Sequence, residues 1–468
     1  MIMPVFLWTD VLVFLLVAIV LAFAWYARRY EHLRAPWREV VRGRIAVASL
    51  VVLAFYTLTG LLDSMHYRKA LPMQEGQIEV QYAGETVSVL DALLGGVGTQ
   101  VEKTYSAPFA ATLFTRETVV DENGVQQRIF PRLKYGGAHL DDPQRDRAAD
   151  IAERSLTSVG QAVVFMLALV LLLSLLLGKR WNCSTKQALL RILRGDTVVP
   201  WRIALFTVFL FVLLAALIVN LASVWHVFGT DKVGKDVLYQ TIKSIRTGLV
   251  IGTLTTLVML PFAVFLGMMA GYFRGWVDDV IQYLYTTLNS IPGVLLIAAS
   301  VLMMQVYIDT HPELFETMAE RADLRLLFLC LILGITSWTG LCRLLRGETL
   351  KLRELDYVQA ANAFGVSRLT IMVRHLLPNL MHLVLIAVVI DFSGLVLAEA
   401  VLSYVGVGVD PTTMSWGNMI NSARLEMARE PMVWWSLLAA FSFMFMLVLA
   451  ANLFSDAVRD AFDPRMRR

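Results

Sequence analysis

The chain has 468 residues, of which 57% are hydrophobic and only 17% are charged, and its mean hydropathy is +0.62. This balance excludes an ordinary soluble enzyme and is typical of a protein that crosses a membrane several times. The formal net charge is only +3, and Lys and Arg cluster between apolar runs, so a face for nucleic acid is not indicated. The three cysteines predict neither a disulfide framework nor a cysteine metal site.

Apolar runs of the length that a membrane-spanning helix requires, about 20 residues, recur along the whole chain. They predict an all-α polytopic membrane protein with about nine transmembrane helices. The runs lie at about 5–26, 45–62, 160–178, 203–224, 247–271, 279–307, 324–343, 382–402 and 434–454. Basic residues gather on one side if the spans alternate, so the positive-inside rule predicts an external N-terminus and a cytoplasmic C-terminus.

The first apolar run is predicted to stay as an anchor and not to be cleaved as a signal peptide. No basic residue precedes it, Asp10 lies within it, and an arginine-rich segment at 27–44 follows it. The run is also not followed by the small residues of a cleavage site.

A polar stretch separates the second run from the third and is long enough for a small exported domain of α+β or β-rich type. Within it, Asp121–Gly124 lies between two β-prone runs, which predicts a hairpin, and a further strand is predicted at 78–82. The predicted parts of the chain are an anchor region with two spans at 1–62, the exported domain at 63–159, an additional span with its cytoplasmic loop at 160–202, and a core at 203–468.

A charged island at 345–379, which we call the docking loop, lies between two long apolar runs. It is too long for a turn within the membrane and too basic for hydrocarbon, so it is predicted to project into water. Asp356–Phe364 is predicted as a short helix that ends at Gly365, a residue that readily takes the left-handed backbone conformation. A second helix is predicted to start near Ser367 and to stop before Pro378, because proline cannot continue it.

The side chains of the first predicted helix indicate a surface for another protein. Ala360 and Ala361 carry so little bulk that a partner can come close to the backbone, while Tyr357 and Phe364 offer large anchors beside them. An ordinary cytoplasmic loop helix is the alternative interpretation of the same pattern.

The docking loop contains D-Y-V-Q-A-A-N-A-F-G, followed after nine residues by H-L-L-P-N. This pattern resembles the cytoplasmic EAA loop of the membrane subunits of ATP-binding-cassette (ABC) importers. Within these importers the loop is most similar to that of the C-type subunit of the dipeptide/oligopeptide permease family. The resemblance implies a coupling helix that sits in a cleft of the ATP-binding subunit, with Gln359 where the family has a glutamate. The implied coupling residues are Asp356, Tyr357, Gln359, Ala360, Ala361, Phe364, Gly365 and Pro378.

Further stretches resemble the same family in order. F-G-T-D-K-V-G-K-D at 228–236 resembles an external motif of the family, and this chain has Lys235 where the family usually has arginine. Residues 270–279 resemble the short inner loop of the family. S-I-P-G at 290–293 resembles the start of the family's next span, which Pro292 is expected to kink. The motif residues of the external loop are Gly229, Asp231, Gly234 and Asp236. Three further stretches resemble the C-terminal part of the family's sequence pattern, namely 399–408, 415–418 and 460–464.

The resemblance implies that the last six spans, within 203–468, form the permease core of an ABC importer. The first 200 residues or so depart from the family, whose members usually have about six spans and no sizeable exported domain. Two segments are candidates for the family's first span, namely the fourth apolar run and 37–62.

Asp391 and Glu399 lie in one apolar run, eight residues apart and so about 80° apart around a helix. Together with Pro292 they are candidates for lining the translocation path or for an interface with a partner subunit. The alternative is that Glu399 is solvated near the outer end and that Asp391 pairs with a neighbouring span. No metal site is predicted, and the isolated histidines interpreted as polar-boundary residues are His226, His375 and His382.

The leading hypothesis is a non-catalytic permease subunit of an ABC importer for peptides or peptide-like solutes in the bacterial inner membrane. The sequence contains no G-x-x-x-x-G-K-[ST] phosphate loop, so ATP is expected on partner subunits, and no cofactor is expected in this chain. The resemblance implies ATP-binding subunits, a second permease subunit in a heterodimer and an extracytoplasmic substrate-binding protein. Membrane lipid is a further partner, and nucleic acid is not.

Two other functions stay open at this point. An ion-coupled secondary transporter would use Asp391 and Glu399 as a proton relay, but it leaves the docking loop without a role. A membrane-anchored sensor would bind a ligand at its external domain, but it leaves the motifs within the spans without a role. The candidate solutes of the importer are dipeptides, longer peptides, antimicrobial peptides, nickel chelates and glutathione.

Overall fold

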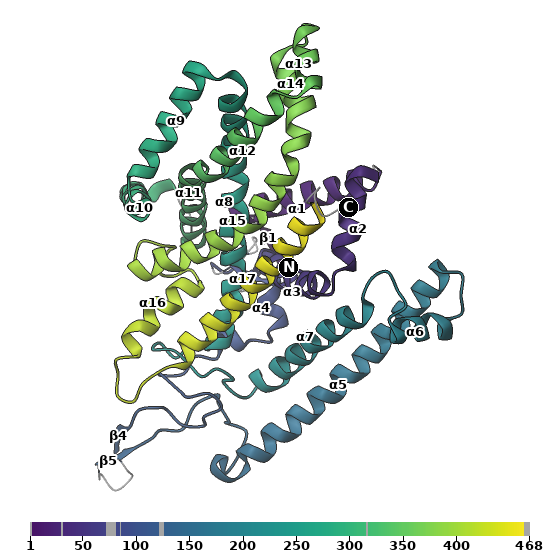
Figure 1. Ribbon diagram of the computed structural model, residues 1–468. Helices are drawn as coiled ribbons and strands as arrows, with labels where there is room; N and C mark the ends of the chain where they lie inside the picture. The colour runs from purple at the N-terminus through teal and green to yellow at the C-terminus, as the bar shows by residue number, and fades with distance from the viewer. Residues whose placement is uncertain are drawn as a thin grey trace. The chain divides into compact units, whose positions relative to one another are not determined.

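The structure is a computed structural model and describes residues 2–29, 31–71, 81–84, 86–120, 126–314 and 317–462. It is mostly helical, with a few short strands (Figure 1). Contacts divide the chain into two compact units. Unit 1 comprises Met1–Val5, Arg38–Arg246 and Met414–Ala450, and unit 2 comprises Phe6–Trp37, Thr247–Thr413 and Ala451–Arg468.

Nine helical segments in the described part of the chain are long and apolar enough to cross a membrane, which confirms the expected number of spans. They are Trp8–Tyr26, Arg44–Asp63, Arg145–Arg180, Trp201–Ala222, Val237–Phe273, Gly293–Thr310, Met318–Arg353, Arg368–Val405 and Trp435–Phe462. Some helices start well before their apolar runs. Helix α5, Pro143–Arg180, begins inside the polar stretch, where Pro143 suits the first turn and Arg154 pairs with Asp150 one turn earlier at 3.0 Å.

The apolar run at 279–307 does not form the single kinked span that the sequence predicts. It is divided between α9, Gly275–Ser290, and α10, Gly293–Thr310. Ile291 between them is extended, with φ −89° and ψ 130°, because the ring of Pro292 disfavours the helical conformation in the residue before it. Pro292 therefore separates two helices instead of bending one.

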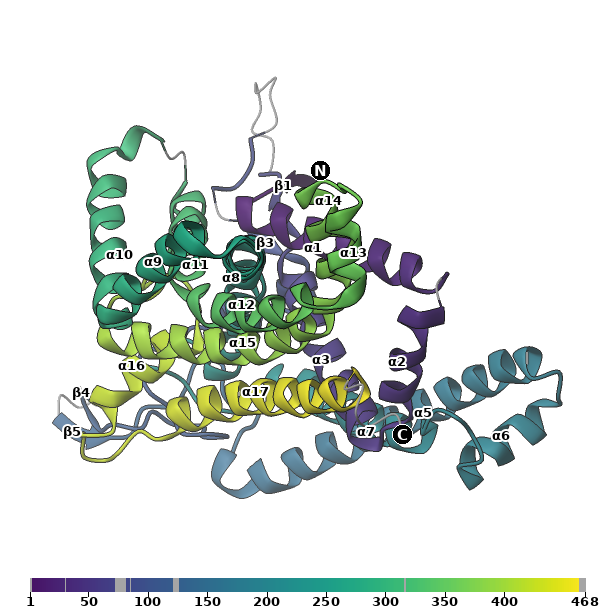
Figure 2. The ribbon, with the colours of Figure 1, turned by 45° about the horizontal axis from the view of Figure 1, so that its top comes forward.

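Unit 1 contains a pair of long neighbouring helices, α5 and α7, Trp201–Ala222 (Figures 1 and 2). The pair is joined by polar contacts, since Nδ2 of Asn220 donates to Oγ of Ser158 at 2.9 Å. Helix α3, Arg44–Asp63, packs on α7 through the rings of Phe55 and Phe211, whose centroids are 4.5 Å apart. Helix α6, Thr185–Arg194, connects α5 to α7.

The strands lie in unit 1. A three-stranded antiparallel sheet has the order β1, Ile2–Val5, then β2, His66–Lys69, then β3, Val87–Ser88, and Ile2 is opposite Lys69. The predicted hairpin is confirmed by the antiparallel pair β4, Glu117–Val120, and β5, Gln126–Ile129. Its turn, Asp121–Gly124, and most of the predicted strand at 78–82 lie outside the described residues. The short helix α4, Val89–Leu93, follows β3 directly.

Two apolar cores lie in the described part of unit 2. The first joins the later half of α8, Val237–Phe273, to α9, α12 and the docking loop, and the second joins the middle of α8 to α10, α11 and the end of α15. Near the start of α11, the carboxylate of Asp323 accepts a hydrogen bond of 3.0 Å from the backbone N–H of Thr9 in α1. The helices of this unit not yet bounded are α1, Trp8–Ala27, α11, Met318–Ser337, α12, Thr339–Arg353, α13, Asp356–Ala363, α14, Arg368–Ile371, and α15, Leu377–Val405.

Three helices contribute residues to both units, and a fourth lies in unit 1. Helix α8 begins in unit 1 and continues in unit 2, and α17, Trp435–Phe462, does the same. Helix α16, Trp416–Glu426, lies in unit 1, and α2, Glu31–Arg42, spans the division at residue 37. The predicted domain boundaries at residues 63, 160 and 203 fall inside unit 1, and they stay a proposal about the chain's organisation.

Candidate functional site

The docking loop is built around α13, which ends as the sequence predicts. Gly365 follows the helix with φ +74°, and its N–H donates to the carbonyl of Asn362 at 3.1 Å. The N–H of Val366 reaches back to the carbonyl of Ala361, also at 3.1 Å. These two bonds form a Schellman cap, in which a left-handed residue satisfies the last carbonyls of a helix. The predicted left-handed glycine is thereby confirmed.

One side of α13 is anchored in the subunit and the other is exposed. Val358 is 1% exposed and belongs to the first core of unit 2, whereas Phe364 is 87% exposed at the tip of the helix. The hydroxyl of Tyr357 accepts a hydrogen bond of 3.1 Å from Asn379, which connects the helix to the start of α15. The helix is therefore attached to its own subunit through Val358 and Tyr357 and exposes the ring of Phe364 at its end.

The two alanines of the motif do not lie on the same side. Ala360 is exposed, but Ala361 is half-buried and packs against the first core of unit 2. The expectation that Ala361 leaves room for a partner is therefore wrong in part, because its methyl group contacts its own subunit. The exposed residues Asp356 and Gln359 lie beside Ala360 on the helix, and the side-chain amide of Gln359 donates to the carbonyl of Glu354 at 3.1 Å.

The helix after Gly365 does not stop before Pro378. Ser367 caps its start by accepting from the N–H of Thr370 at 3.3 Å, as predicted, but the helical segment then runs on to Val405. A single π turn at Met372–Leu376 precedes the proline, and the N–H of Leu377 donates to the carbonyl of Met372 five residues earlier. The wider turn relieves the clash that Pro378 makes with a regular preceding helical turn, and proline is tolerated at the start of α15.

Hydrogen bonds connect the docking loop to residues 270–279. These residues resemble a separate motif of the same family, its short inner loop. The guanidinium of Arg346 donates to both carboxylate oxygens of Asp278 at 2.6 and 2.7 Å. Arg353 donates to the carbonyl of Tyr272 at 2.6 Å. A paired arginine and carboxylate with two parallel bonds fixes both distance and direction. Sequence reasoning named neither Arg346 nor Asp278 as a functional residue, although both lie in quoted motifs.

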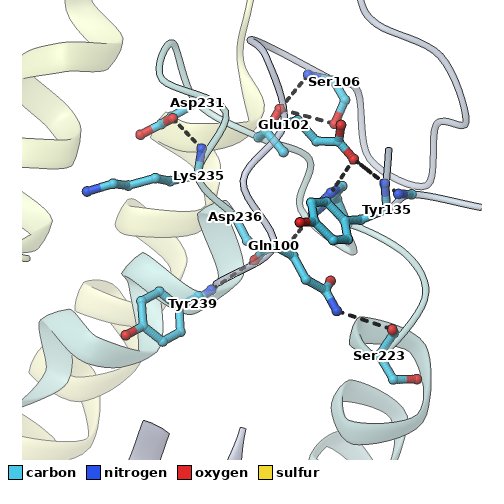
Figure 3. A network of polar contacts seen from close by, with 12 residues as sticks. Gln100, Glu102, Ser106, Tyr135, Ser223, Asp231, Lys235, Asp236 and Tyr239 are labelled. Atoms are coloured by element: carbon cyan, nitrogen blue, oxygen red, sulfur yellow. Dashed lines mark hydrogen bonds and ion pairs between the residues drawn. The ribbon is translucent and has the colours of Figure 1, made fainter. Parts of the chain in front are cut away.

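The external motif at 228–236 folds into a compact turn. Asp231 accepts from the N–H of Lys235 at 2.9 Å (Figure 3). It also accepts from the N–H of Val233 at 2.9 Å and from the side chain of Gln240 at 2.8 Å. Asp236 caps the start of α8 by accepting from the N–H of Tyr239 at 3.0 Å. The two motif carboxylates are therefore structural acceptors that shape the entrance of α8.

A buried ion cluster joins this motif to the preceding polar stretch. His226 is 1% exposed, and its ring nitrogens lie 2.8 Å from Asp236 and 3.3 Å from Glu102. The expectation that His226 is a residue at a polar boundary is wrong, because it lies between two buried carboxylates. The sequence contains no local signal for this contact, since Glu102 is 124 residues away from His226.

The electrostatics of this cluster favour the charged forms. Burial by itself would raise the pKa of Glu102, but hydrogen bonds from His226 and from the backbone N–H groups of residues 134–136 lower it to about 2. Burial by itself would lower the pKa of His226, but hydrogen bonds to Asp236 and Glu102 raise it to about 9. These pKa shifts hold His226 as a positive imidazolium and Glu102 as a negative carboxylate near neutral pH.

The polar stretch lies directly on the external motif near Glu102 (Figure 3). A Cβ atom added at Gly234 would overlap the carbonyl oxygen of Glu102, and φ at Gly234 is +79°, so both space and backbone conformation require glycine there. The hydroxyl of Thr230 accepts from the N–H of Ser106 at 2.6 Å and donates to the carbonyl of Thr104 at 2.8 Å. Residues 102–106 are thus held by the motif loop.

Two further contacts attach the polar stretch to helices of unit 1. Tyr105 donates to Glu426 at the end of α16, with 3.0 Å between the oxygens. Lys243, in the first turns of α8, lies 2.6 Å from Asp63 at the end of α3 and 3.1 Å from Asp91 in α4. The N-terminal span α3 is in this way connected to a helix of the region that resembles the family.

The two ionisable candidates of α15 differ in their surroundings. Glu399 is 2% exposed and accepts from the hydroxyl of Ser403 at 2.7 Å, so it is not solvated. Asp391 is partly buried, and among the described residues no hydrogen-bond or ion-pair partner contacts its carboxylate.

Comparisons with known proteins point in one direction. Residues 263–468 match the family described as the binding-protein-dependent transport system inner membrane component. The oligopeptide transport system permease protein OppC of Mycobacterium bovis is 30% identical over 242 residues, which cover 52% of this chain and 77% of the relative. The glutathione transport system permease protein GsiD of Pectobacterium atrosepticum is 32% identical over 244 residues, which cover 52% and 73%.

One more relative and one solved structure are also similar to parts of this chain. The dipeptide transport system permease protein DppC of Bacillus subtilis is 28% identical over 243 residues, covering 52% of this chain and 70% of the relative. A solved structure of the MetNI methionine ABC transporter, in inward-facing conformations, has a TM-score of 0.37 and 15% identity, and covers 48% of this chain and 97% of that chain.

Proposed function

Because this chain belongs to the family of inner-membrane permease components of binding-protein-dependent transport systems, we propose that it forms half of the translocation path of an ATP-driven importer for peptides or peptide-like solutes. The peptide class is proposed because the relatives OppC, DppC and GsiD carry names of oligopeptide, dipeptide and glutathione transport systems. The chain is a permease subunit of an ABC importer, and the choice of solute is the part that we propose.

The observation that supports coupling is the construction of the docking loop. Phe364 projects from a capped helix, and that helix is held to its subunit by buried Val358 and by the hydrogen bond from Asn379 to Tyr357. A load on such a rigid surface passes to α15 and to the pair of Arg346 with Asp278, instead of being absorbed by a flexible loop. We propose that ATP-driven closure of partner subunits acts on this surface.

The partners follow from the family. Binding-protein-dependent transport requires ATPase subunits and a solute-binding protein, and we propose that the former contact the docking loop while the latter meets the external side. We further propose a second, different permease subunit that completes the path, and the bacterial inner membrane as the location. ATP hydrolysis is assigned to the ATPase subunits, since the sequence of this chain has no phosphate-binding loop.

We propose that the polar stretch serves delivery of solute on the external side. The contacts of Glu102 and Ser106 with the external motif support this assignment, because a protein seated on the stretch would bear on the turn that starts α8. Deleting residues 70–150 tests the role, with a short flexible linker joining the end of α3 to the remaining part of α5 at residues 151–180. Unchanged uptake of every solute by an inserted deletion variant would remove it.

The function as a whole is tested by reconstitution. The full complex with ATPase subunits and binding protein is placed in proteoliposomes, and uptake of a peptide bound by that protein is measured with and without ATP. ATP-dependent uptake that also requires the binding protein is expected. Uptake by this chain alone, driven by a proton gradient and abolished by Asp391→Asn, would instead identify an ion-coupled transporter.

A further inference from the structure

Residues at the end of α1 and the start of α2 line an open cavity of about 300 Å³ within unit 2. We call this place the α1–α2 elbow, and its lining residues are Val20, Phe23, Ala24, Arg28, Arg34 and Trp37. A volume near 300 Å³ is at the lower end for sites that hold small organic molecules. None of these residues takes part in the docking loop or in the external motif.

The lining is ordered along the two helices. Val20, Ala24 and Arg28 follow one another at intervals of four residues, so they form one ridge of α1 that is apolar first and basic at its end. Arg34 and Trp37 are three residues apart and share a face of α2. The ring of Trp37 is packed edge-on against Phe462 of α17, with 5.6 Å between the centroids, which fixes this wall of the cavity.

The elbow lies where a membrane surface is expected. Helix α1 supplies the spanning segment Trp8–Tyr26, and the exposed rings of Trp25 and Tyr26 stand at its end. Such exposed aromatic rings gather at the level of the lipid headgroups. The guanidinium of Arg29 covers the ring of Trp25 at 3.7 Å, so basic side chains begin directly at this level. The apolar part of the cavity therefore lies at the level of the lipid acyl chains, and its two arginines lie at the level of the lipid headgroups.

The described residues supply no carboxylate partner for the two arginines of the cavity. In the described part of the chain no carboxylate pairs with Arg28 or Arg34, whereas Arg42 on the same helix α2 pairs with Glu39 at 3.2 Å. Arginine binds phosphate oxygens through paired N–H donors. Two guanidinium groups at the polar end of an apolar cavity match a molecule that joins an anionic phosphate to a hydrocarbon chain.

We propose that the α1–α2 elbow binds one anionic phospholipid. Arg28 and Arg34 contact its phosphate, and one acyl chain lies along Val20, Phe23 and Ala24 against Trp37. The site joins the N-terminal anchor to the C-terminal end of α17 through the contact of Trp37 with Phe462. A bound lipid therefore stabilises the attachment of the N-terminal helices within unit 2.

The test measures binding to the purified full-length chain in detergent. The probes are phosphatidylglycerol and phosphatidylcholine with the same oleoyl chains, and glycerol 3-phosphate as a phosphate without acyl chains. Native mass spectrometry gives the lipid affinity, and thermal unfolding gives the stabilisation by each probe. The variants are Arg28→Gln with Arg34→Gln, which removes the charge, and Ala24→Trp, which fills the cavity. Arg42→Gln is the control, because it removes a paired arginine of the same helix outside the cavity.

Phosphatidylglycerol is expected to bind more tightly than phosphatidylcholine, and each removed arginine should weaken it about fivefold. Ala24→Trp should weaken both lipids, while Arg42→Gln should leave both affinities unchanged. Equal affinity of wild type and the double glutamine variant would overturn the proposal, as would equal loss in Arg42→Gln. Glycerol 3-phosphate binding as tightly as the lipid would also overturn the proposal, because the acyl chain would then contribute nothing. If Ala24→Trp fails to fold, Val20→Phe takes its place. These readouts involve no transport, so they stand apart from the proposed function.

Discussion

The backbone N–H of Glu102 donates to the carbonyl oxygen of Gly234 at 2.9 Å. A residue of the polar stretch thus lies against the backbone of a motif glycine in the external loop, at the entrance of α8. Glu102 also belongs to the cluster in which His226 lies between Glu102 and Asp236. The stretch that departs from the family and a motif that resembles it are therefore one structural element in this chain.

Gly234→Ala tests that close approach. A Cβ atom at Gly234 overlaps the carbonyl oxygen of Glu102 and must also take a positive φ, so we expect a loss of about 2–4 kcal/mol in stability. Gly95→Ala is the matched control, because Gly95 also has positive φ, +63°, but nothing lies within 4 Å of its Cβ position. Its expected cost is about 1 kcal/mol. Thermal unfolding of both variants gives the difference, and equal costs would contradict the close contact.

The ion cluster should make stability depend on pH on both sides. The pKa of His226 is raised from 6.5 to about 9, so its stabilisation is complete below pH 6.5 and disappears as the pH rises through 9. The pKa of Glu102 is lowered from 4.5 to about 2, so its stabilisation is complete above pH 4.5 and disappears as the pH falls through 2. The difference in Tm between wild type and His226→Gln should therefore be largest between pH 4.5 and 6.5 and shrink toward pH 9. A difference that stays constant or grows across that range would contradict the assignment.

Gly365 should be essential for the shape of the docking loop. Gly365→Val places a β-branched residue at φ +74° and should cost about 1–2 kcal/mol locally, while nothing lies close enough to clash with its Cβ. Gly365→Asn is the control, because asparagine tolerates the left-handed conformation. We expect ATP-dependent uptake in proteoliposomes to fall in the valine variant and to be largely kept in the asparagine variant. Full uptake in both would mean that the helix end is not part of the transmission.

The exposed tip of α13 should hold the ATPase subunits. Phe364→Ala is expected to weaken their attachment by about 2 kcal/mol, or about thirtyfold, since a buried aromatic anchor is a typical interface hot spot. Gln359→Ala should be mild, because its amide bonds the carbonyl of Glu354 within the loop. Co-purification of ATPase subunits measures both. Ala361→Trp should also release them, but with loss of stability, because Ala361 packs on the core of its own subunit. Normal retention in Phe364→Ala would exclude the tip as the contact.

The predicted topology is tested by labelling. A cysteine at Gln126, which is exposed in β5, should react with an impermeant thiol reagent added outside, and a cysteine at Asn362 in α13 should react only after the membrane is opened. Both are made in a background with Cys183→Ser, since the other two native cysteines are buried. The reverse labelling pattern would invert the orientation of the whole chain.

The sequence by itself determined the features that rest on local physics. Nine spans follow from the apolar length that a bilayer requires, and the end of α13 follows from the preference of Gly365 for positive φ. The hairpin of β4 and β5 follows from β-prone runs on either side of a turn. The family was readable because its motifs are short and contiguous.

The tertiary structure decided the features that depend on residues far apart in the chain. The burial of His226 is possible only because Glu102 and Asp236 surround it, since a buried charge without partners is costly and its partners are not local in sequence. Ala361 faces its own subunit because Val358 and Val366 set the rotation of α13 on the core, which helical spacing alone does not specify. The helix continues past Pro378 because packing of Met372 and Leu376 stabilises a π turn that local propensity disfavours. In each case the energy of long-range burial outweighs a local preference, and that energy is defined only once the chain is folded.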